Sequence, residues 1–346
     1  MKNQQVFERQ VIMKNPLIGV LIGDPSGIGP EIAVKLLKND EIYKVARPVL
    51  IGAKTVVKQA LRFCKLDSNL IEVSSPSEGI YKKENINLVN IDNIGDYKMG
   101  AVQASCGRAA YEYIALGTQL ALKGELDAIA TAPINKESLK AAGVQFIGHT
   151  EILAGLTKTK NPLMMFEVRG MRVFFLSRHV SLAEAIASVT EERVLHYIGL
   201  CSRALEKLGV GGGVLAVAGL NPHCGENGLF GDEEINQISP AVNKAKEMGF
   251  SVEGPLPADS VFHQALKGNY SGVLSLYHDQ GHIATKTVDF ERTVAVTLGL
   301  PFLRVSVDHG TAFDIAGTGV ASETSLFEAV KAAALYAPGY SRSANE

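Results

Sequence analysis

Three histidines follow short apolar runs that are typical of buried strands. His179 follows MRVFFLSR, His223 follows VLAVAGLNP, and His278 follows GVLSLY. Because ligands of open α/β sheets bind beyond the carboxyl ends of the strands, we expect these imidazoles to lie at one edge of a sheet. Three neutral imidazoles would form an open metal site with positions left for substrate oxygens. The spacings match no local metal motif, however, and each histidine taken alone could instead cap a strand or bond to a loop.

Two further polar segments could bind an anion. Residues 23–31 (GDPSGIGPE) supply glycines and a helix start, where backbone N–H groups can approach a negative charge. The segment matches neither the dinucleotide fingerprint nor a Walker A loop, and a tight strand-to-helix turn explains it equally well. Residues 148–151 (GHTE) would open a second helix, with Thr150 as its N-cap and His149 directed at an anion.

Two cations and two loops complete the candidate chemistry. Lys286 and Arg304 follow His278 and could neutralise a phosphate, although each alone would more commonly be a solvated surface charge. Residues 221–234 and 306–317 form long, glycine-punctuated loops of the kind that carries function. Cys224 lies in the first of these loops, but no neighbour that would lower its pKa is evident, so we interpret it as a bystander.

The apolar pattern predicts the elements that must position these residues. Buried strands are expected at residues 17–22, 48–52, 127–130, 163–168, 171–176, 214–218, 273–276 and 294–298, whereas residues 66–104 are expected to be less regular, with short apolar pieces such as 86–89. The runs at 163–168 and 171–176 would pair as a hairpin. Helices are expected from residue 29 and at residues 55–63, 109–123, 191–208, 233–248 and 322–336. Strands that alternate with helices in this way indicate an α/β protein with a largely parallel sheet.

Composition excludes several classes of protein. The 34 Lys and Arg residues nearly balance 36 Asp and Glu residues, and the chain has no Trp, so neither a basic stripe nor stacking platforms favour nucleic acid. Four widely spaced cysteines without a CxxC pair suit a reducing compartment. No apolar stretch approaches the roughly 20 residues of a membrane span, and residues 1–16 lack the core of a signal peptide. We therefore expect a cytoplasmic protein with a 16-residue N-terminal extension, in which Met13 is an alternative start.

Several longer runs resemble a known family. They occur in order between Ile18 and Ala334, and together they are far more specific than any single motif above. The runs are GDPSGIGPE, TAPINKE, GHTE, NPHCGENGLFGDEE, GPLPAD, YHDQGH, TLGLPFLR and SVDHGTAFDIAGTG. They resemble those of the 4-hydroxythreonine-4-phosphate dehydrogenase family.

The resemblance implies a fold, an assembly and a ligand set. It implies an α/β fold similar to that of isocitrate and isopropylmalate dehydrogenases, with residues 17–346 forming one catalytic unit of two interleaved subdomains around a cleft. It implies a homodimer whose site is shared, NAD or NADP as cofactor, and a divalent metal, commonly zinc, with Mg, Co or Mn as alternatives. The metal would be held by three histidines, one of them from the partner subunit: His179, His223 and His278. Substrate would contact four residues: His149, Thr150, Lys286 and Arg304.

The implied reaction oxidises the 3-hydroxyl of a small 4-phosphorylated hydroxy acid and releases CO2. The default substrate is 4-hydroxythreonine 4-phosphate, a precursor in pyridoxal phosphate biosynthesis. A metal on the hydroxyl oxygen would lower its pKa, and the cofactor would carry the hydride. Proton handling is assigned to three candidates: Lys136, Asp259 and Asp279. The sequence identifies no cofactor-binding residues and does not separate NAD from NADP.

Two positions depart from the family pattern. Ala295 stands where the family usually has a substrate-contacting Asn, and His282-Ile283 stands where the vitamin B6 branch usually has Leu-Pro. The histidine resembles paralogues that act on 4-phospho-D-threonate or 4-phospho-D-erythronate, so these acids are alternative substrates. A non-catalytic phosphoacid-binding protein and a metallohydrolase with the same three histidines are alternatives of other classes.

Overall fold

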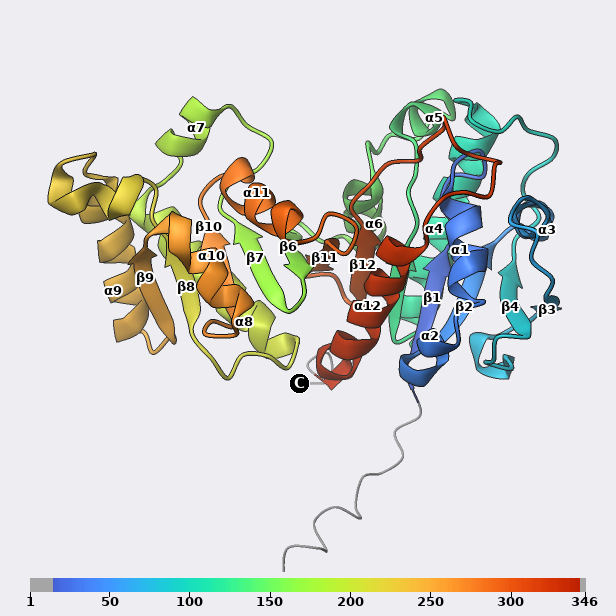
Figure 1. Cartoon of the computed structure of the whole chain (residues 1–346), viewed down its shortest axis with the longest axis horizontal. Coiled ribbons are helices and arrows are strands. Elements are labelled where there is room, and N and C mark those ends of the chain that lie inside the picture. The colour runs from blue at the N-terminus through green and yellow to red at the C-terminus, as the bar shows by residue number, and fades with distance from the viewer. Residues whose placement is uncertain (1–14, 343–346) are drawn as a thin grey trace, which may run out of the picture.

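The structure is a computed structural model that describes residues 15–342 (Figure 1). Most of the expected N-terminal extension, including Met13, therefore lies outside the described residues. The strands are β1 Leu17–Leu21, β2 Arg47–Gly52, β3 Asn69–Glu72, β4 Asn85–Asn90, β5 Ala128–Thr131, β6 Leu163–Val168, β7 Met171–Phe175, β8 Leu215–Ala218, β9 Val252–Leu256, β10 Gly272–Ser275, β11 Val294–Leu298 and β12 Leu303–Val307.

Helices alternate with these strands along the chain, which confirms the expected α/β class. The α-helices are α1 Gly29–Leu36, α2 Asp40–Val45, α3 Lys54–Phe63, α4 Ala104–Leu122, α5 Lys136–Ala141, α6 His149–Thr157, α7 Leu182–Ala187, α8 Glu191–Lys207, α9 Ser239–Glu247, α10 Ala258–Leu266, α11 His278–Val288 and α12 Thr324–Arg342. Three short helical segments are η1 Pro76–Glu78, η2 Pro222–Gly228 and η3 Glu234–Ile238.

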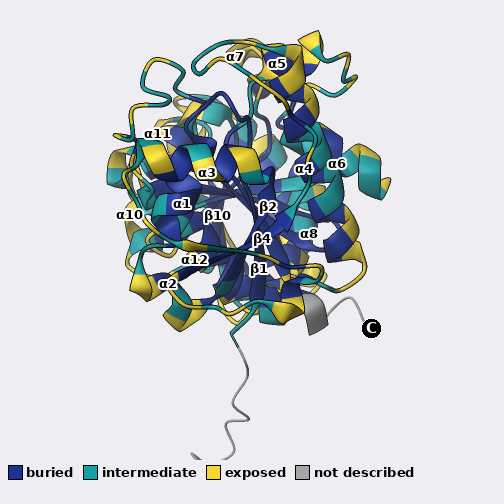
Figure 2. Cartoon of the chain, turned by 90° about the vertical axis from the view of Figure 1, so that its right-hand side faces the viewer, coloured by how far each residue is buried: buried dark blue, intermediate teal, exposed yellow. Residues whose placement is uncertain are grey.

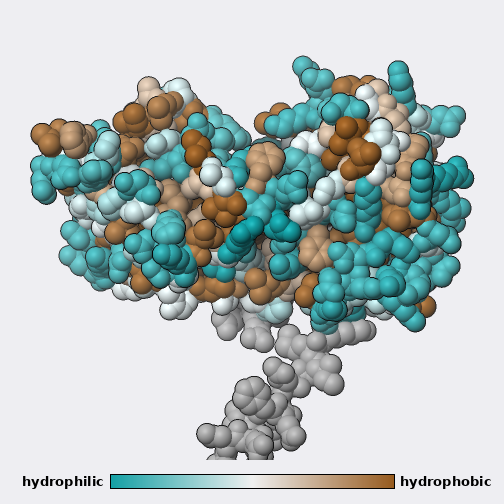
Figure 3. All heavy atoms as spheres, viewed as in Figure 1, coloured by the Kyte–Doolittle hydropathy of each residue, from teal (hydrophilic) through white to brown (hydrophobic). Residues whose placement is uncertain are grey.

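The strands form one sheet in the order β3-β4-β2-β1-β5-β12-β11-β6-β7-β10-β8-β9. All neighbouring pairs are parallel except β12–β11, β11–β6 and β6–β7. Helices cover both faces of the sheet and enclose a buried interior (Figure 2). The space-filling view shows that the upper surface is hollowed between the left and right parts of the molecule (Figure 3).

The order of the sheet has one consequence for the predicted site. β7, β10 and β8 are parallel neighbours, so their carboxyl ends lie at one edge of the sheet. These are the strands that precede His179, His278 and His223, which confirms that the three segments reach the same edge.

The hairpin predicted at residues 163–176 is also confirmed. β6 and β7 pair in antiparallel fashion and are joined by Arg169 and Gly170, both with positive φ (50° and 84°). Two positive φ values in a two-residue turn match the right-handed twist of the flanking strands, and glycine adopts such a conformation without strain.

Several elements differ from expectation. The helix expected at 233–248 is divided into the π-type turn η3 and the helix α9. Residues 66–104 contain β3 and β4 as well as irregular chain. Thr150 is not the N-cap of its helix: α6 begins at His149, its N-cap is Gly148, and no side chain caps it. The strand β12, whose run LRVSV contains Arg304, was not expected.

Candidate active site

A cavity of about 330 Å³ lies at the edge of the sheet where the strands deliver their polar residues. It brings together seven residues that the sequence predicted for catalysis, substrate or metal: Lys136, His149, Thr150, His179, His278, Lys286 and Arg304. The two positions that depart from the family pattern, His282 and Ala295, also line it. These nine residues come from α5, α6, α11, β11, β12 and the loop after β7, and they converge on one space.

Arg304 is the most unusual charge in this cavity. It projects from β12, is only 3% exposed, and donates hydrogen bonds to the hydroxyls of Thr131 on β5 and Thr297 on β11, at 2.8–3.0 Å. Burial lowers its pKa to about 9, so it remains protonated at neutral pH. Among the described residues it forms no ion pair, and a buried cation without a counter-charge is costly. The guanidinium is thus prepared for an anionic ligand.

His149 lies beside this guanidinium at the start of α6. Burial, together with the charge of Arg304, lowers the pKa of His149 well below its ordinary value. The imidazole is therefore neutral at pH 7, and its buried Nε2 has no hydrogen-bond partner among residues 15–342. An orphaned nitrogen that shares a cavity with an unpaired arginine points to a polar ligand that is bound by both.

Lys286 and Lys136 add positive charge to the rim. Lys286 Nζ lies 2.9 Å from Asp308 Oδ2 and 5.1 Å from the centre of the Phe290 ring. Lys136 is exposed at the first position of α5 and has no ion pair within the described chain. The cavity therefore offers more positive than negative groups, which suits a substrate with several negative charges.

Two of the three predicted metal ligands face each other. The ring centres of His179 and His278 are 5.9 Å apart. Burial, followed by the charges of Arg178 and His278, lowers the pKa of His179, which favours the neutral form that a metal requires. His278 Nδ1 lies 2.7 Å from Asp279 Oδ1, and such a contact leaves Nε2 free for a ligand.

His223 lies apart from this pair. It is in η2, where residues 223–227 have positive φ, and its side chain is 65% exposed and 3.1 Å from Glu226 Oε1. It does not line the cavity. In the part of the chain that the structure describes, no group of three or more His, Cys, Asp and Glu side chains is placed to hold a metal ion. A single chain therefore brings together two of the three predicted ligands.

The proton-handling candidates are divided in the same way. Lys136 lines the cavity, whereas Asp279 lies against His278 and lines an adjoining cavity of about 360 Å³. Asp259 is exposed at the start of α10, outside both cavities. Its charge contributes, after burial and Glu234, to raising the pKa of Cys224 to about 11. A thiol that remains protonated is no nucleophile, which agrees with Cys224 being a bystander.

The two unusual positions form one wall of the cavity. The His282 ring is stacked on Phe175 with ring centres 4.6 Å apart, and it contacts the rings of Phe166 and His278 at 4.3 and 4.2 Å. Burial, followed by the charge of His278, lowers its pKa to about 4. Its buried Nδ1 has no hydrogen-bond partner in the part of the chain that the structure describes. Ala295 lies on β11 next to this wall, where its methyl group offers no hydrogen bond.

Sequence reasoning did not single out three charged residues of the cavity: Arg178, Glu151 and Asp308. Arg178 directly precedes His179, and burial lowers its pKa. Glu151 lies in the first turn of α6. Asp308 directly follows β12. Arg178 and Glu151 directly adjoin the predicted site residues His179 and Thr150, and this adjacency was the signal that could have identified them. Asp308 follows β12, a strand that was not expected, so the predicted strands gave no signal for it.

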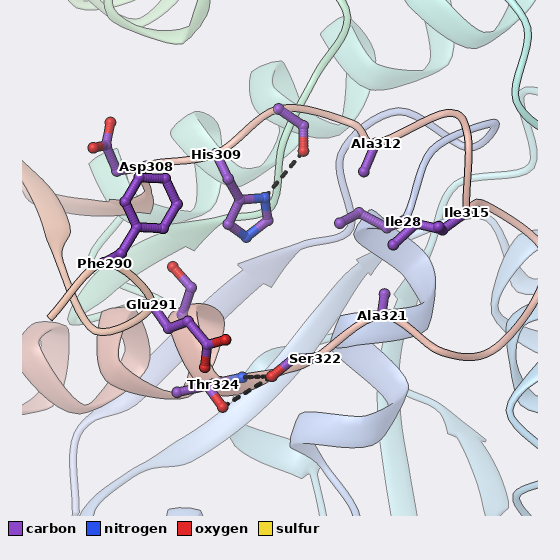
Figure 4. Close-up of a pocket in the computed structure, with 12 residues that line it drawn as sticks. Ile28, Phe290, Glu291, Asp308, His309, Ala312, Ile315, Ala321, Ser322 and Thr324 are labelled. Carbon is purple, nitrogen blue, oxygen red and sulfur yellow. Dashed lines mark hydrogen bonds between the residues drawn. The ribbon is translucent and has the colours of Figure 1, made fainter. Parts of the chain in front are cut away.

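A second cavity of about 500 Å³ adjoins the first, and Asp308 lines both (Figure 4). Its walls come from the loop before α1, the loop after β12, the start of α12 and the segment between α11 and β11. Figure 4 shows Phe290, Glu291 and His309 on one side of the hollow, and Ile28, Ile315 and Ala321 on the other. Residues 23–31 form the tight turn that was one of their two interpretations: the Ser26 amide and hydroxyl donate to Asp24 Oδ1, and the Ile28 amide donates to Thr311 O.

Comparison with known proteins places the chain in a family. The family described as "Pyridoxal phosphate biosynthetic protein PdxA" matches residues 44–333. A curated relative from Clostridium botulinum, named "Putative D-threonate 4-phosphate dehydrogenase", is 59% identical over 96% of this chain and 100% of its own length. A relative of the same name from Halalkalibacterium halodurans is 56% identical over 94% of this chain and 98% of its own length.

Solved structures agree with this assignment. The crystal structure of 4-hydroxythreonine-4-phosphate dehydrogenase from Klebsiella pneumoniae superposes with a TM-score of 0.86 at 40% identity, covering 93% of this chain and 99% of that chain. No helix in residues 15–342 is long and apolar enough to cross a membrane. The chain belongs to the PdxA family, and it is a dehydrogenase that acts on a CH–OH group.

Proposed function

We propose that this protein oxidises the 3-hydroxyl of a 4-phosphorylated 3-hydroxy acid with NAD(P) and decarboxylates the product, with a divalent metal bound. The observation that carries the proposal is the polarity of the cavity. An unpaired buried arginine and a neutral histidine line it, and so does a pair of facing histidines. The first two groups suit a phosphate, and the histidine pair suits a metal-assisted reaction.

The phosphate is assigned to Arg304, His149, Thr150 and Lys286. Arg304 is held by two hydroxyls, so its planar group is oriented before an anion arrives. Neutral His149 can donate a hydrogen bond to a phosphate oxygen, and Lys286 adds charge from the rim. Because these groups are fixed in advance, little ordering is needed when the substrate binds.

The metal is assigned to His179, His278 and His223, with zinc as the leading candidate. The chemistry of the donor pair fits, because the pKa of His179 is lowered and Asp279 lies on the Nδ1 side of His278. When bound, the divalent cation supplies Lewis acidity for the hydroxyl that loses its proton. The distance of His223 from the pair supports a homodimer in which one protomer contributes this third ligand to its partner's site.

The proton of the hydroxyl is assigned to Lys136, which alone among the three candidates lines the cavity. Hydride transfer from C3 leaves a ketone β to the carboxylate. Such an acid loses CO2 readily, because the electrons of the broken bond move into the carbonyl. The positive groups of the cavity would stabilise the enolate, which is then protonated at C2.

The cofactor is assigned to the second cavity. Its lining combines apolar side chains with the flat rings of Phe290 and His309 and the hydroxyls of Ser322 and Thr324, a set that suits a nucleoside. The shared Asp308 puts the cavity next to the substrate. When bound there, the nicotinamide cofactor accepts the hydride. The four dispersed free cysteines support a cytoplasmic location for this chemistry.

Glu31 and Lys35 of α1 hold the loop that lines this second cavity. The buried Glu31 carboxylate accepts hydrogen bonds from the amides of Gly317 and Gly319, and Lys35 donates to the carbonyls of Gly319 and Ala321. We expect Glu31→Gln to lower the free energy of unfolding by about 1–3 kcal/mol and to raise the KM for NAD more than it lowers kcat, because the loop loses a charged acceptor. Urea unfolding and initial rates would measure both effects. Glu41→Gln, at an exposed site on α2, is the control.

The default substrate is 4-hydroxythreonine 4-phosphate, and one observation favours D-threonate 4-phosphate as a second candidate. The two acids differ at C2, which carries an ammonium in the first and a hydroxyl in the second. Ala295 removes an amide from the wall and His282 adds a neutral imidazole with an orphaned Nδ1. A neutral nitrogen in a cavity rich in cations favours a hydroxyl over an ammonium. The names of the relatives from C. botulinum and H. halodurans agree.

We expect Ala295→Asn to shift the ratio of kcat/KM for the two acids toward 4-hydroxythreonine 4-phosphate by about 10-fold or more, because one hydrogen bond in a closed site contributes roughly 1–3 kcal/mol to discrimination. Initial rates with both acids would measure it. Ala295→Val, which adds bulk without an amide, is the matched control. An equal shift for Asn and Val would show that the volume of the side chain, rather than its hydrogen bonding, determines the preference between the two acids.

The deciding experiment for the function is a substrate panel. The purified chain, loaded with zinc, is given each phosphorylated acid with NAD or NADP, and nicotinamide reduction and CO2 release are followed. Reduction with either acid supports the proposal. Tight binding of the acids without reduction would favour a non-catalytic phosphoacid-binding protein. Release of inorganic phosphate without cofactor would favour a metallohydrolase.

A further inference from the structure

Arg178 is a cation of the first cavity to which the proposed function gives no role. It directly precedes His179, lies outside every run that carries the family resemblance, and is half-buried. Within the part of the chain that the structure describes, its side chain forms no hydrogen bond and no ion pair. Lys286 and Arg304 differ in this respect, because Lys286 belongs to an ion pair and Arg304 is held by two threonine hydroxyls. Arg178 is therefore a guanidinium that can bind an anion without first losing a partner.

The backbone that carries Arg178 is fixed to the end of β10 and to α8. The Ser177 hydroxyl donates a hydrogen bond to the carbonyl of Leu276, and the Arg193 guanidinium donates one to the carbonyl of Leu176, both at 2.8 Å. Ser177 is buried, so the first of these bonds is shielded from water. The Arg178 backbone is thus held in place before a ligand arrives, which lowers the entropic cost of binding.

Arg178 accompanies the histidine pair at the junction of two cavities. Three residues line both the first cavity and the adjoining cavity of about 360 Å³: Arg178, His179 and His278. None of the four residues assigned to the phosphate lines that adjoining cavity. Arg178 is therefore grouped with the residues assigned to the metal, and the hydroxyl that reacts there would lie near it.

The proposed substrate has two anionic groups on opposite sides of its reacting carbon. The phosphate is attached through C4, the hydroxyl that is oxidised is on C3, and the carboxylate is C1. The phosphate already has its partners, whereas no residue has been assigned to the carboxylate. A carboxylate that enters a partly closed cavity loses hydration, and this loss must be compensated. Arginine is suited to this task, because its parallel N–H groups match the two oxygens of a carboxylate.

We infer that Arg178 binds the C1 carboxylate of the substrate, and that this contact makes the protein select phosphorylated acids over phosphorylated alcohols of the same length. The inference rests on the proposed function, because it takes the assignments of the phosphate and the metal as given. Lys136 also has no ion pair within the described chain, but it is exposed and offers a single ammonium instead of a planar fork. The carboxylate leaves as CO2 only after the hydride has been transferred. The contact is therefore present both when the substrate binds and when C3 is oxidised, so its loss should raise KM more than it lowers kcat.

The test is direct binding to the full-length, zinc-loaded protein without NAD, measured by titration calorimetry. Each of the two candidate acids is compared with its matched alcohol, in which a CH2OH group replaces the carboxylate. We expect at least one acid to bind about 30-fold or more tightly than its alcohol. In Arg178→Gln this ratio should fall by about 10-fold or more, through weaker binding of the acid alone. Arg178→Lys should recover part of the ratio, because the charge remains while the planar fork is lost.

Two controls separate this role from a general effect of charge. Arg203→Gln, at an exposed site on α8, makes the same change in net charge and should leave the ratio unchanged. Inorganic phosphate should raise the melting temperature of Arg178→Gln as much as that of the wild type. If this protection is lost in Arg178→Gln, Arg178 belongs to the phosphate site and the inference is wrong.

The remaining outcomes distinguish the inference from the proposed function. If the wild type binds each acid and its alcohol equally while an acid still reduces NAD, the inference is wrong and the proposed function stands. A preference for the acid that persists in Arg178→Gln would overturn the role of Arg178. If neither acid binds, both the inference and the proposed function fail.

Discussion

Replacing Arg304 by Met is expected to lower kcat/KM by about 1,000-fold, because a buried charge-assisted contact with a phosphate contributes several kcal/mol when it cannot be replaced by water. Arg304 is nearly inaccessible, and among the described residues its side chain bonds to the hydroxyls of Thr131 and Thr297. Its guanidinium therefore forms no ion pair with a described residue until an anion binds. Lysine should not restore the activity, because an ammonium lacks the planar fork that meets both hydroxyls and a phosphate.

The same substitution should not unfold the protein. An unpaired buried cation is costly, so a methionine of similar length is expected to leave the free energy of unfolding unchanged or to raise it. Inorganic phosphate should raise the melting temperature of the wild-type protein, since a ligand that binds only the folded state stabilises it, and should have little effect on Arg304→Met. Initial rates and thermal unfolding with and without phosphate would measure these effects. Arg203→Met, at an exposed site on α8, is the control.

Two results would contradict this prediction. If phosphate protects Arg304→Met as well as it protects the wild type, the anion binds elsewhere. If Arg304→Met is destabilised as strongly as it is inactivated, Arg304 is primarily a structural residue whose bonds to Thr131 and Thr297 hold β5, β12 and β11 together.

Replacing His278 by Ala is the second change with a very large expected effect. We expect zinc to be lost and kcat to fall by about 1,000-fold or more, because the metal supplies several kcal/mol of stabilisation to the developing charge. Asp279→Asn should retain the ligand but weaken zinc binding by about 10–100-fold, since an outer-shell carboxylate fixes the orientation of the ring. Elemental analysis after dialysis and rates across a zinc titration would separate the two effects.

His196→Ala is the control for the loss of an imidazole, because His196 lies on α8 outside the first cavity. A His278→Ala protein that keeps its zinc and its rate would disprove the assignment of this residue.

A mixing experiment tests whether the metal site is shared between protomers. His223→Ala and His278→Ala proteins are each expected to be inactive. If His223 serves the partner's site, a mixed dimer regains one intact site, and re-equilibrated mixtures should reach about a quarter of the wild-type rate. If all three histidines of a site come from one chain, the mixture stays inactive. His179→Ala mixed with His278→Ala, two changes on the same side of the site, should stay inactive in either case.

Much of the fold follows from local patterns in the sequence. The buried strands at β1, β2, β7, β8, β10 and β11 are short apolar runs, and the expected ranges differ from the observed ones by one or two residues at most. The hairpin of β6 and β7 is marked by Arg169-Gly170 between two such runs. β12 was not expected, although its run alternates Leu303, Val305 and Val307 with the polar residues Arg304 and Ser306, a pattern typical of a half-exposed strand. In the structure both polar residues are buried, because β12 lies in the middle of the sheet.

The sequence by itself determined the family, the α/β class and the fact that His179, His278 and His223 follow strands, because these depend on residue types and on spacing along the chain. Only the tertiary structure decided that Arg304 is buried without a counter-charge, that Arg178 lines the same two cavities as the histidine pair, and that His223 lies away from the other two histidines. These properties depend on which strands become neighbours. Strand order arises from contacts between distant segments, and burial and pairing follow from it, so neither can be derived from local spacing.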